Sequence, residues 1–349
     1  MRCTAERPVC YSFGMRAIVI GDPQTTHQYF LRPLRAAGLL DDSDRLRADA
    51  CLLSVGDHFD FKSSAGWTVT DIGQEGIAIL EWLESHPPEQ VGILMGNHDA
   101  CRVMELHRIT DDDFTAARLL GDKTAFKDRF PDIPTPNIAQ RDFSSFSTAQ
   151  RAAVQRLLLS GRMVLAATGR TASGRSVLVT HAGVTKRELA LLGIPDERSP
   201  EIIATALNAF LQSRLERVRE DWLAGRPAPL DLSPVHLSGV SGREGGGLLY
   251  HRPQAHLEGW SAEHARRFHP SWLPAGLLQV CGHTQHKKMP ELLDAVPEVP
   301  EGALRSLWFD GEIRYAAGLV EREDGLWMVD SGLNLSDNPS LLELAALDL

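Results

Sequence analysis

Five short apolar runs in this chain end abruptly at residues that can bind a metal ion. The runs cover residues 17–20, 51–55, 93–95, 177–180 and 277–280, and the side chains that follow them are Asp22, Asp57, Asn97, His181 and His283. Apolar runs of this length next to glycine are typical of strands buried on both faces of a sheet. Because ligands collect where such strands end, the five runs predict one shared site.

The side chains at these strand ends indicate the chemistry of that site. Two aspartates, one asparagine and two histidines offer oxygen and imidazole ligands but no thiolate. This set suits Mn, Fe or Zn, and a carboxylate that bridges suits two ions about 3.5–4 Å apart. A structural zinc site explains the set less well. A single Gly-Asp or Gly-His pair has no diagnostic value, whereas the ordered set of five does.

The motifs occur in a characteristic order. They read Gly21-Asp22-Pro23-Gln24, Gly56-Asp57-His58-Phe59-Asp60-Phe61, Gly96-Asn97-His98-Asp99, His181-Ala182-Gly183 and Gly282-His283-Thr284. From about Met15 to Gly332 the chain resembles the calcineurin-like metallophosphoesterases, close to the bacterial phosphoprotein-phosphatase-like branch. The resemblance implies a mixed α/β (α+β) fold, in which a two-sheet β-sandwich is flanked by helices to give four layers.

The resemblance also implies a role for each motif residue. Asp22 and Gln24 would face one metal ion, Asp57 would bridge, and the second ion would be held by Asn97, His181 and His283. His98 would protonate the leaving alkoxide, and Asp60 would orient the His98 imidazole and raise its basicity. The alternative for His98 is a hydrogen-bonding residue that supports the ligands. The implied cofactor is a pair of divalent ions, which lower the pKa of a bridging water.

Two positions depart from the family pattern. Gln24 stands where the family has a histidine, and an amide oxygen is a weaker ligand for a transition metal than imidazole, so the first metal site is expected to be weak or to prefer a harder ion. Phe61 stands where the family has an arginine that grips the substrate phosphate. Arg252, Arg102 and Lys62 are the candidates for a replacement cation, with Arg252 ranked first. Each has the alternative of being a solvated surface charge, and for Lys62 that alternative is favoured.

The order of the motifs predicts one large domain. The chain has 349 residues, and no cut between Asp22 and His283 leaves a complete site on one side. We expect a tail over residues 1–14 and a single domain over 15–349. Two proline-rich or glycine-rich stretches, about 101–146 and 223–269, are expected to be insertions that either cover the site or pack peripherally.

Local patterns predict helices between the strands. Apolar spacing indicates helices over 25–37 and 71–83, a Ser147 capping box precedes a third helix, and Ser199-Pro200 opens a longer one. Residues 304–329 are expected to form a strand meander, because Asp310-Gly311 and Asp324-Gly325 are dipeptides preferred in tight hairpins.

Charge and cysteine content limit the partners and the compartment. The net charge is −10 and no basic cluster lies on one predicted face, which argues against an extensive nucleic-acid surface. The sequence shows no apolar run long enough to span a membrane. Five cysteines without Cys-x-x-Cys spacing favour a reducing compartment, so a cytoplasmic location is expected. The expected partner is a phosphorylated substrate, and the oligomeric state is left open.

Three functions are compatible with these residues. The leading hypothesis is a metal-dependent phosphoesterase that hydrolyses phosphomonoesters, on phosphoprotein or on small phosphorylated molecules. A second is a hydrolase of nucleotides or dinucleoside polyphosphates, as in related enzymes of the superfamily. A third, prompted by Gln24 and Phe61, is a pseudo-phosphatase that binds phosphorylated ligands with little or no turnover.

Overall fold

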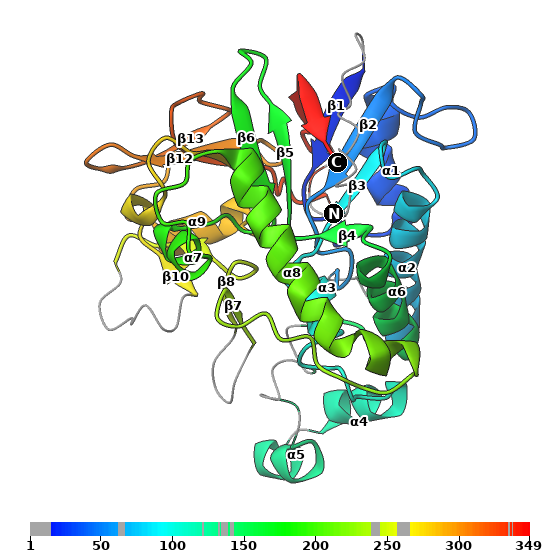
Figure 1. The fold of residues 1–349 in the computed structure, drawn as a ribbon. Helices are drawn as coiled ribbons and strands as arrows, with labels where there is room; N and C mark the ends of the chain where they lie inside the picture. The colour runs from blue at the N-terminus through cyan, green and yellow to red at the C-terminus, as the bar shows by residue number, and fades with distance from the viewer. Residues whose placement is uncertain are drawn as a thin grey trace, which may run out of the picture.

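Two large β-sheets form the centre of the molecule (Figure 1). The computed structural model describes residues 15–61, 67–120, 122–131, 133, 139, 143–238, 245–256, 266–333, 336 and 338–349. The predicted tail over residues 1–14 lies outside this part of the chain. The mixed α/β class predicted from the sequence, with sheets flanked by helices, is confirmed.

The first sheet has five strands and is mostly parallel. Its order is β15 (Leu342–Leu344), β1 (Arg16–Ile20), β2 (Ala50–Ser54), β3 (Val91–Leu94) and β4 (Met163–Val164). The strands β1 to β4 pair in parallel, and β15 runs antiparallel to β1. The carboxyl ends of β1, β2 and β3 therefore lie side by side at one edge.

The second sheet has seven strands and mixed directions. Its order is β13 (Ile313–Ala317), β12 (Arg305–Phe309), β14 (Gly325–Met328), β11 (Leu278–Cys281), β6 (Ser176–Thr180), β5 (Ala166–Arg170) and β16 (Ala346–Asp348). Strand β11 pairs in parallel with β6 on one side and with β14 on the other. The ends of β6 and β11 are thus neighbours too.

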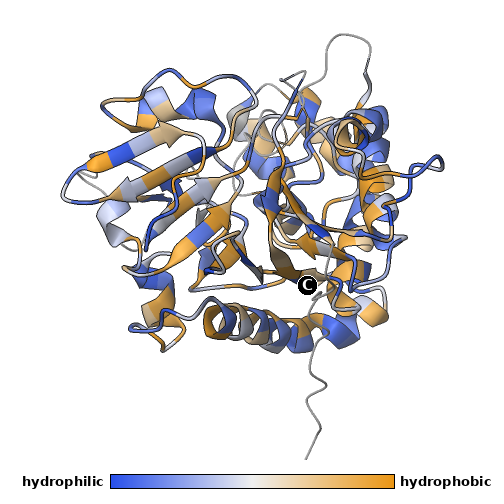
Figure 2. Ribbon diagram, turned by 90° about the horizontal axis from the view of Figure 1, so that it is seen from above, coloured by the Kyte–Doolittle hydropathy of each residue, from blue (hydrophilic) through white to orange (hydrophobic). Residues whose placement is uncertain are grey.

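An apolar core lies between the two sheets. It collects alternate residues of the inner strands, including Val19 of β1, Leu53 of β2, Val179 of β6 and Val280 of β11. Figure 2 views the sheets from above, with apolar residues along their strands. Each such side chain stabilises the fold by about 1.5–3 kcal/mol when it is fully buried. This packing fixes the spacing between the two sheets, and hence between their strand ends.

Helices cover the outer faces. The outer side of the first sheet packs against α1 (His27–Ala36), α2 (Val69–Glu84) and α6 (Thr148–Leu159), whose apolar residues share one cluster with alternate strand residues. On the second sheet, α8 (Pro200–Leu223) lies over β5 and β6, and α9 (Met289–Leu292) packs on the far side of β11 and β14. The remaining helices are α3 (Asn97–Cys101), α4 (Asp111–Leu119), α5 (Lys123–Arg129) and α7 (Lys186–Leu191), with the 3-10 turns η3 (Pro270–Trp272) and η4 (His286–Lys288).

The expected helix starts are confirmed by their caps. Ser147 and Gln150 form the predicted capping box of α6, and Pro200 occupies the first turn of α8 behind the cap Ser199. The strand meander predicted for residues 304–329 is confirmed only in part. β12 and β13 form the hairpin around Asp310-Gly311, but β14 pairs with β12 and β11 instead of β13. Asp324-Gly325 is therefore not the turn of a hairpin between β13 and β14. In its interior position β14 is hydrogen-bonded to two strands, whereas pairing with β13 would have left it at the edge of the sheet with one partner.

The two predicted insertions differ in character. In the first, α4 and α5 enclose an apolar cluster of their own around Phe114, Phe126 and Phe130, and they lie at the lower end of the view in Figure 1. The second contributes the two-stranded pairs β7 (His236–Leu237) with β8 (Gly246–Gly247), and β9 (Arg252–Pro253) with β10 (Arg267–Phe268). Among the described residues, no helix is long and apolar enough to cross a membrane.

Candidate metal centre

The two sheets bring together the ends of the five strands singled out from the sequence. Asp22 follows β1, Asp57 follows β2 and Asn97 follows β3, while His181 and His283 follow β6 and β11. All five side chains are buried. The first three therefore come from the first sheet and the two histidines from the second.

Glycines let the connecting turns approach one another closely. A Cβ atom on Gly96 would lie 2.2 Å from Asp57 Oδ1, and one on Gly282 would lie 2.0 Å from Asp22 Oδ1. A Cβ atom on Gly56 would lie 2.4 Å from the backbone nitrogen of Gly96. Any larger residue would push these turns apart, so the glycines of the motifs determine how tightly the ligand-type side chains gather.

Unusual backbone conformations also concentrate at the strand ends. Among the described residues, five that are not glycine have a positive φ, and four of them are Gln24 (25°), Asp57 (61°), Asp60 (71°) and His283 (63°). Such conformations cost about 1–3 kcal/mol each and persist where the surroundings enforce them, commonly at functional sites. The backbone is therefore strained at these four positions, and the strained conformations direct their side chains toward the strand ends.

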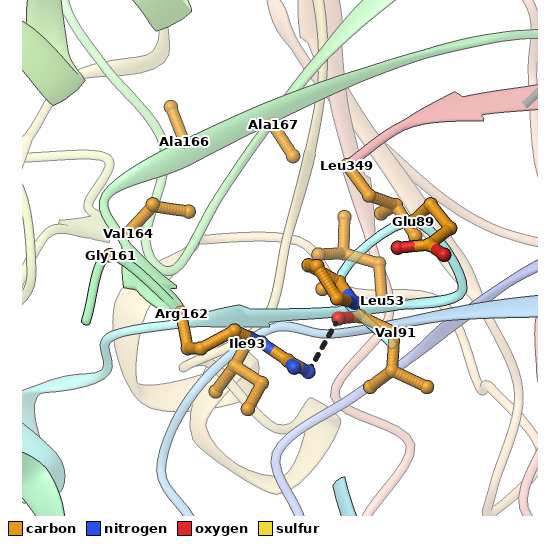
Figure 3. Close-up of a pocket in the computed structure, with 12 residues that line it drawn as sticks. Leu53, Glu89, Val91, Ile93, Gly161, Arg162, Val164, Ala166, Ala167 and Leu349 are labelled. Carbon is orange, nitrogen blue, oxygen red and sulfur yellow. Dashed lines mark hydrogen bonds between the residues drawn. The ribbon is translucent and has the colours of Figure 1, made fainter. Parts of the chain in front are cut away.

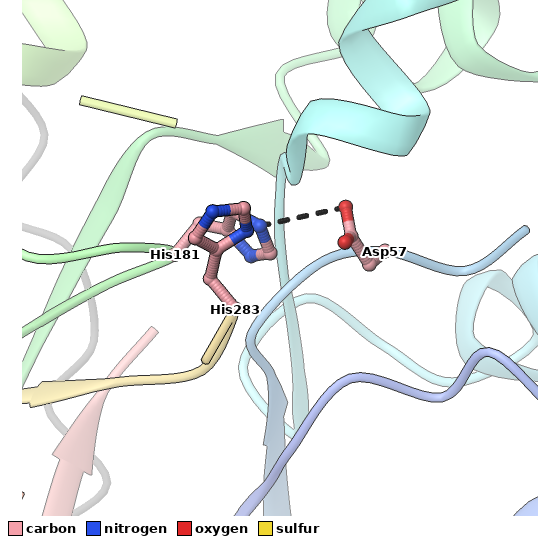
Figure 4. A group of neighbouring side chains, drawn as sticks. All are labelled: Asp57, His181 and His283. Atoms are coloured by element: carbon pink, nitrogen blue, oxygen red, sulfur yellow. Dashed lines mark ion pairs between the residues drawn. The ribbon is translucent and has the colours of Figure 1, made fainter. Parts of the chain in front are cut away.

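Asp57 and His181 present lone pairs to a shared space. His181 Nδ1 lies 2.7 Å from the carbonyl oxygen of Val55, which can only accept, so Nδ1 carries the proton and Nε2 has the lone pair. That Nε2 lies 3.1 Å from Asn97 Oδ1. It also lies 3.4 Å from Asp57 Oδ1 (Figure 4). Three electron-pair donors therefore converge, and a cation placed among them would satisfy all three.

His283 extends the same group. Its ligand nitrogen, that of His181 and a carboxylate oxygen of Asp57 all lie within 4.8 Å of one another. Both ring nitrogens of His283 are buried without a hydrogen-bond partner, a rare and costly arrangement unless a ligand is present. Burial, together with the nearby positive charge of Arg252, holds the pKa of His283 well below its ordinary value. The imidazole is therefore neutral, as metal binding requires.

Asp22 lies on the other side of this group. Its two carboxylate oxygens accept from the backbone N–H of His283 at 3.0 and 2.9 Å. Burial, Asp330 and Asp57 all raise the pKa of Asp22 well above its ordinary value, because three carboxylates share a dry space. A divalent cation would relieve that repulsion, so these residues fit a metal centre. No metal ligand roles beyond this fit follow from the geometry, and the assignments to two ions stay predictions.

Gln24 contacts Asp57 directly. Its Nε2 lies 3.4 Å from Asp57 Oδ2, and its backbone N–H donates to the carbonyl of Asp57 at 3.1 Å. The side chain at this position thus reaches the proposed bridging carboxylate. In this arrangement the amide nitrogen faces the carboxylate, so the amide oxygen would have to turn toward a cation in order to bind it.

His98 and Asp60 form a pair beside the centre. His98 Nδ1 lies 2.8 Å from Asp60 Oδ2, and its Nε2 lies 3.9 Å from Asp57 Oδ2. Asp60 also accepts from the backbone N–H of Ser145 at 2.9 Å. Burial lowers the pKa of His98, but the charge of Asp57 and the hydrogen bond and charge of Asp60 outweigh it, so the pKa is raised overall. These neighbours favour the protonated form of His98, whose Nε2 is the ring nitrogen on the side of Asp57.

Arg102 is not placed to bind substrate, contrary to one prediction from the sequence. Its side chain is fully buried, its Nη1 lies 2.6 Å from Asp60 Oδ2, and its Nη2 donates to the carbonyl of Ser145 at 2.8 Å. The guanidinium also lies 4.5 Å from the ring centre of Phe59. Despite burial, Arg102 and His98 hold the pKa of Asp60 below its ordinary value. Arg102 therefore keeps Asp60 ionised.

Sequence analysis missed the role of Asp99. This buried carboxylate accepts from the backbone N–H groups of Gly96 and Asp57, both at 2.9 Å, and from His58 at 3.1 Å. It also pairs with His58 Nδ1 at 3.0 Å. Asp99 thus joins the turn after β2 to the turn after β3. A signal was available, since Asp99 stands three residues after the helix-capping Gly96. No local sequence signal indicates the contact of Ser145 with Asp60, because the two residues are far apart in the sequence.

The structure bears on two of the positions considered for phosphate binding, Phe61 and Arg252. Phe61 is buried and its ring packs edge-on against Trp67, with 5.5 Å between ring centres. Lys62 lies outside the described residues. Arg252 is partly exposed on β9, and its charge acts on His283. Arg252 therefore remains the predicted cation of those named from the sequence.

The metal centre is distinct from a nearby apolar cavity. A cavity of about 250 Å³ lies between the sheets and is lined by residues such as Leu53, Ile93, Ala167 and Leu349 (Figure 3). Arg162 at its rim donates to the carbonyl of Val91 at 3.3 Å. None of the strand-end ligands lines this cavity, so it is not where the centre's chemistry would occur.

Comparisons with known proteins give little further constraint. No protein-family model matches the chain, and no curated protein sequence matches it. Among solved structures, a cold-active protein tyrosine phosphatase aligns with a TM-score of 0.41 and 14% identity, over 95% of this chain and 73% of that one. A protein serine/threonine phosphatase from Saccharomyces cerevisiae, described as similar to human phosphatase PP5, aligns with a TM-score of 0.34 and 14% identity, over 83% and 63%. Likenesses this distant assign no function to the chain.

Replacing His283 tests the metal centre. We expect His283→Ala to weaken Mn²⁺ or Zn²⁺ binding by more than about 10-fold, because even residues that only support ligands contribute 10- to 100-fold. Isothermal titration calorimetry on metal-stripped protein measures this directly. His256→Ala is the control, since His256 is exposed and forms an ion pair with the surface residue Asp294. Equal affinities for wild type and His283→Ala would exclude His283 as a ligand.

Proposed function

We propose that this chain is a metal-dependent phosphoesterase of the calcineurin-like type that hydrolyses phosphomonoesters. The observation that carries the proposal is the convergence of Asp57, His181 and His283 beside the paired His98 and Asp60. A cluster of ligands suits many reactions. An imidazole held beside that cluster, with neighbours that favour its protonated form, suits reactions in which a leaving group must take up a proton.

The residues at the strand ends would bind the metal ions. Asp22, Asp57, Asn97, His181 and His283 would hold divalent metal ions, with Gln24 at the edge of the group. Two such ions, when bound, polarise phosphoryl oxygens and make hydroxide available near neutral pH. Manganese, iron and zinc all suit these ligands, and the weaker first site implied by Gln24 is part of the proposal.

His98 would act as the general acid. Its Nε2 faces the carboxylate of Asp57, and its Nδ1 is held by Asp60. Asp60 in turn is fixed by Arg102 and Ser145, which leaves the imidazole one orientation. The proton on Nε2 would pass to the alkoxide oxygen of the departing alcohol. Because the nucleophile is water, no covalent intermediate with the protein is required.

Hydrolysis of an aryl phosphate tests the proposed activity. Metal-stripped protein titrated with Mn²⁺ is expected to release the chromogenic phenol, and Asp57→Asn is expected to abolish this turnover, since it removes the charge shared by both ion positions. Asp310→Asn is a matched control, because Asp310 lies on the surface in the β12–β13 turn. Turnover of a diadenosine polyphosphate but not of the aryl phosphate would favour a polyphosphate hydrolase. Phosphate binding without any turnover would favour a pseudo-phosphatase.

The pH dependence tests His98 and Asp60. Asp60 raises the pKa of His98, so Asp60→Asn lowers that pKa and the acid loses its proton at lower pH. The alkaline limb of kcat/KM is therefore expected to move to lower pH, with kcat reduced about 10- to 100-fold. Rate measurements across pH, with the melting temperature recorded for each protein, check this. An unchanged alkaline limb would mean that His98 is not the acid.

A further inference from the structure

The short strands β9 and β10 place two arginines on one face. Arg267 is directly opposite Arg252 in this parallel pair. Because side chains alternate along a strand, paired residues project to the same side and their neighbours to the other. His251, Pro253 and Phe268 are buried, whereas Arg252 and Arg267 are both partly exposed. The two arginines thus share the open face of the pair.

Contacts on the buried side of this pair anchor it to helix α7. The ring centres of His251 and Phe268 are 5.7 Å apart, and His251 Nε2 lies 3.4 Å from the buried Glu188 of α7. Burial alone would raise the pKa of Glu188. The charge of His251 and the hydrogen bonds from His251, Thr185 and Arg187 outweigh that effect and hold the pKa of Glu188 at about 2. Glu188 is therefore ionised, and β9 and β10 are tied to a helix that follows the metal-ligand strand β6.

The open face lies near the metal centre. Tyr250, just before β9, has its ring centre 6.0 Å from that of His283. Arg252 stands two residues after Tyr250, and Arg267 is paired with Arg252 across the two strands. Arg267 comes from the second insertion, and nothing in the local sequence motif marks it. The structure alone brings it beside Arg252.

The motif that this chain resembles has an arginine where Phe61 stands. Phe61 carries no charge, and Arg102 is committed to Asp60 inside the protein. A phosphate monoester carries up to two negative charges, and a guanidinium binds its oxygens through two parallel hydrogen bonds. A second arginine beside Arg252 would compensate for the missing one.

We propose that Arg267 binds the substrate phosphate together with Arg252, so that the second insertion supplies the clamp that Phe61 cannot. The proposal rests on the proposed function, since it concerns the same site. It assigns to strands β9 and β10 the role of a substrate wall. The group that they would recognise is a phosphoryl dianion.

Phosphate binding tests this without turnover. The affinity of Mn²⁺-loaded protein for inorganic phosphate is measured by isothermal titration calorimetry for wild type, Arg267→Gln and Arg267→Lys. We expect Arg267→Gln to weaken binding about 10-fold, the usual loss for one charge-assisted hydrogen-bonding group. Arg267→Lys should recover only part of this, because lysine keeps the charge but not the fork. Arg314→Gln removes an equal charge from the exposed edge strand β13 and should bind as wild type does.

The outcomes separate the inference from the proposed function. Wild-type phosphate affinity in Arg267→Gln, or no phosphate binding by the wild type, would overturn the inference. If Arg267→Gln fails to fold, Arg267→Lys carries the test alone, and its affinity must fall below that of wild type. Weaker phosphate binding in a protein that hydrolyses no aryl phosphate would support the clamp while contradicting the proposed phosphoesterase activity.

Discussion

The arrangement of the whole site depends on a group of buried oxygen and nitrogen atoms that lie close together without enough hydrogen-bond donors between them. Asp57, Asn97 and His181 turn lone pairs toward each other, Asp22 and Asp330 add negative charge, and neither ring nitrogen of His283 has a hydrogen-bond partner. Such a group is unfavourable without a cation, because buried acceptors and like charges repel. The fold holds it together through inter-sheet packing and through glycine turns that approach closely. This group lowers the free energy of unfolding of the metal-free protein, and a bound metal ion would raise it again.

Two buried carboxylates outside the ligand set keep this arrangement in place. Asp99 joins the turns after β2 and β3 by accepting three backbone N–H groups. Asp60 connects His98 to Arg102 and to Ser145, which lies at the end of the first insertion. The first insertion is therefore coupled to the proposed acid, although its helices α4 and α5 pack largely on one another. The second insertion reaches the centre through Tyr250, whose ring lies against that of His283.

Much of this follows from local sequence. The apolar runs, their glycines and the ligand-type residues after them predicted the strands and the place where they meet, since each signal lies within about six residues. The capping box at Ser147 located α6 for the same reason. What the sequence left open depends on distant contacts. Arg102 looked like a surface cation because its partner, Asp60, is 42 positions away in the chain. The pairing of β14 with β12 and the placement of Arg267 beside Arg252 are likewise decided by tertiary structure.

The central claim is that five strand ends build one centre for divalent metal ions. Crystals of the Mn²⁺-loaded protein, measured at a wavelength where manganese scatters anomalously, test it most directly. The account predicts two anomalous peaks about 3.5–4 Å apart, with Asp57 between them and the weaker peak on the side of Asp22 and Gln24. An anomalous map with no peak among Asp57, His181 and His283, in protein shown to bind Mn²⁺, would contradict it.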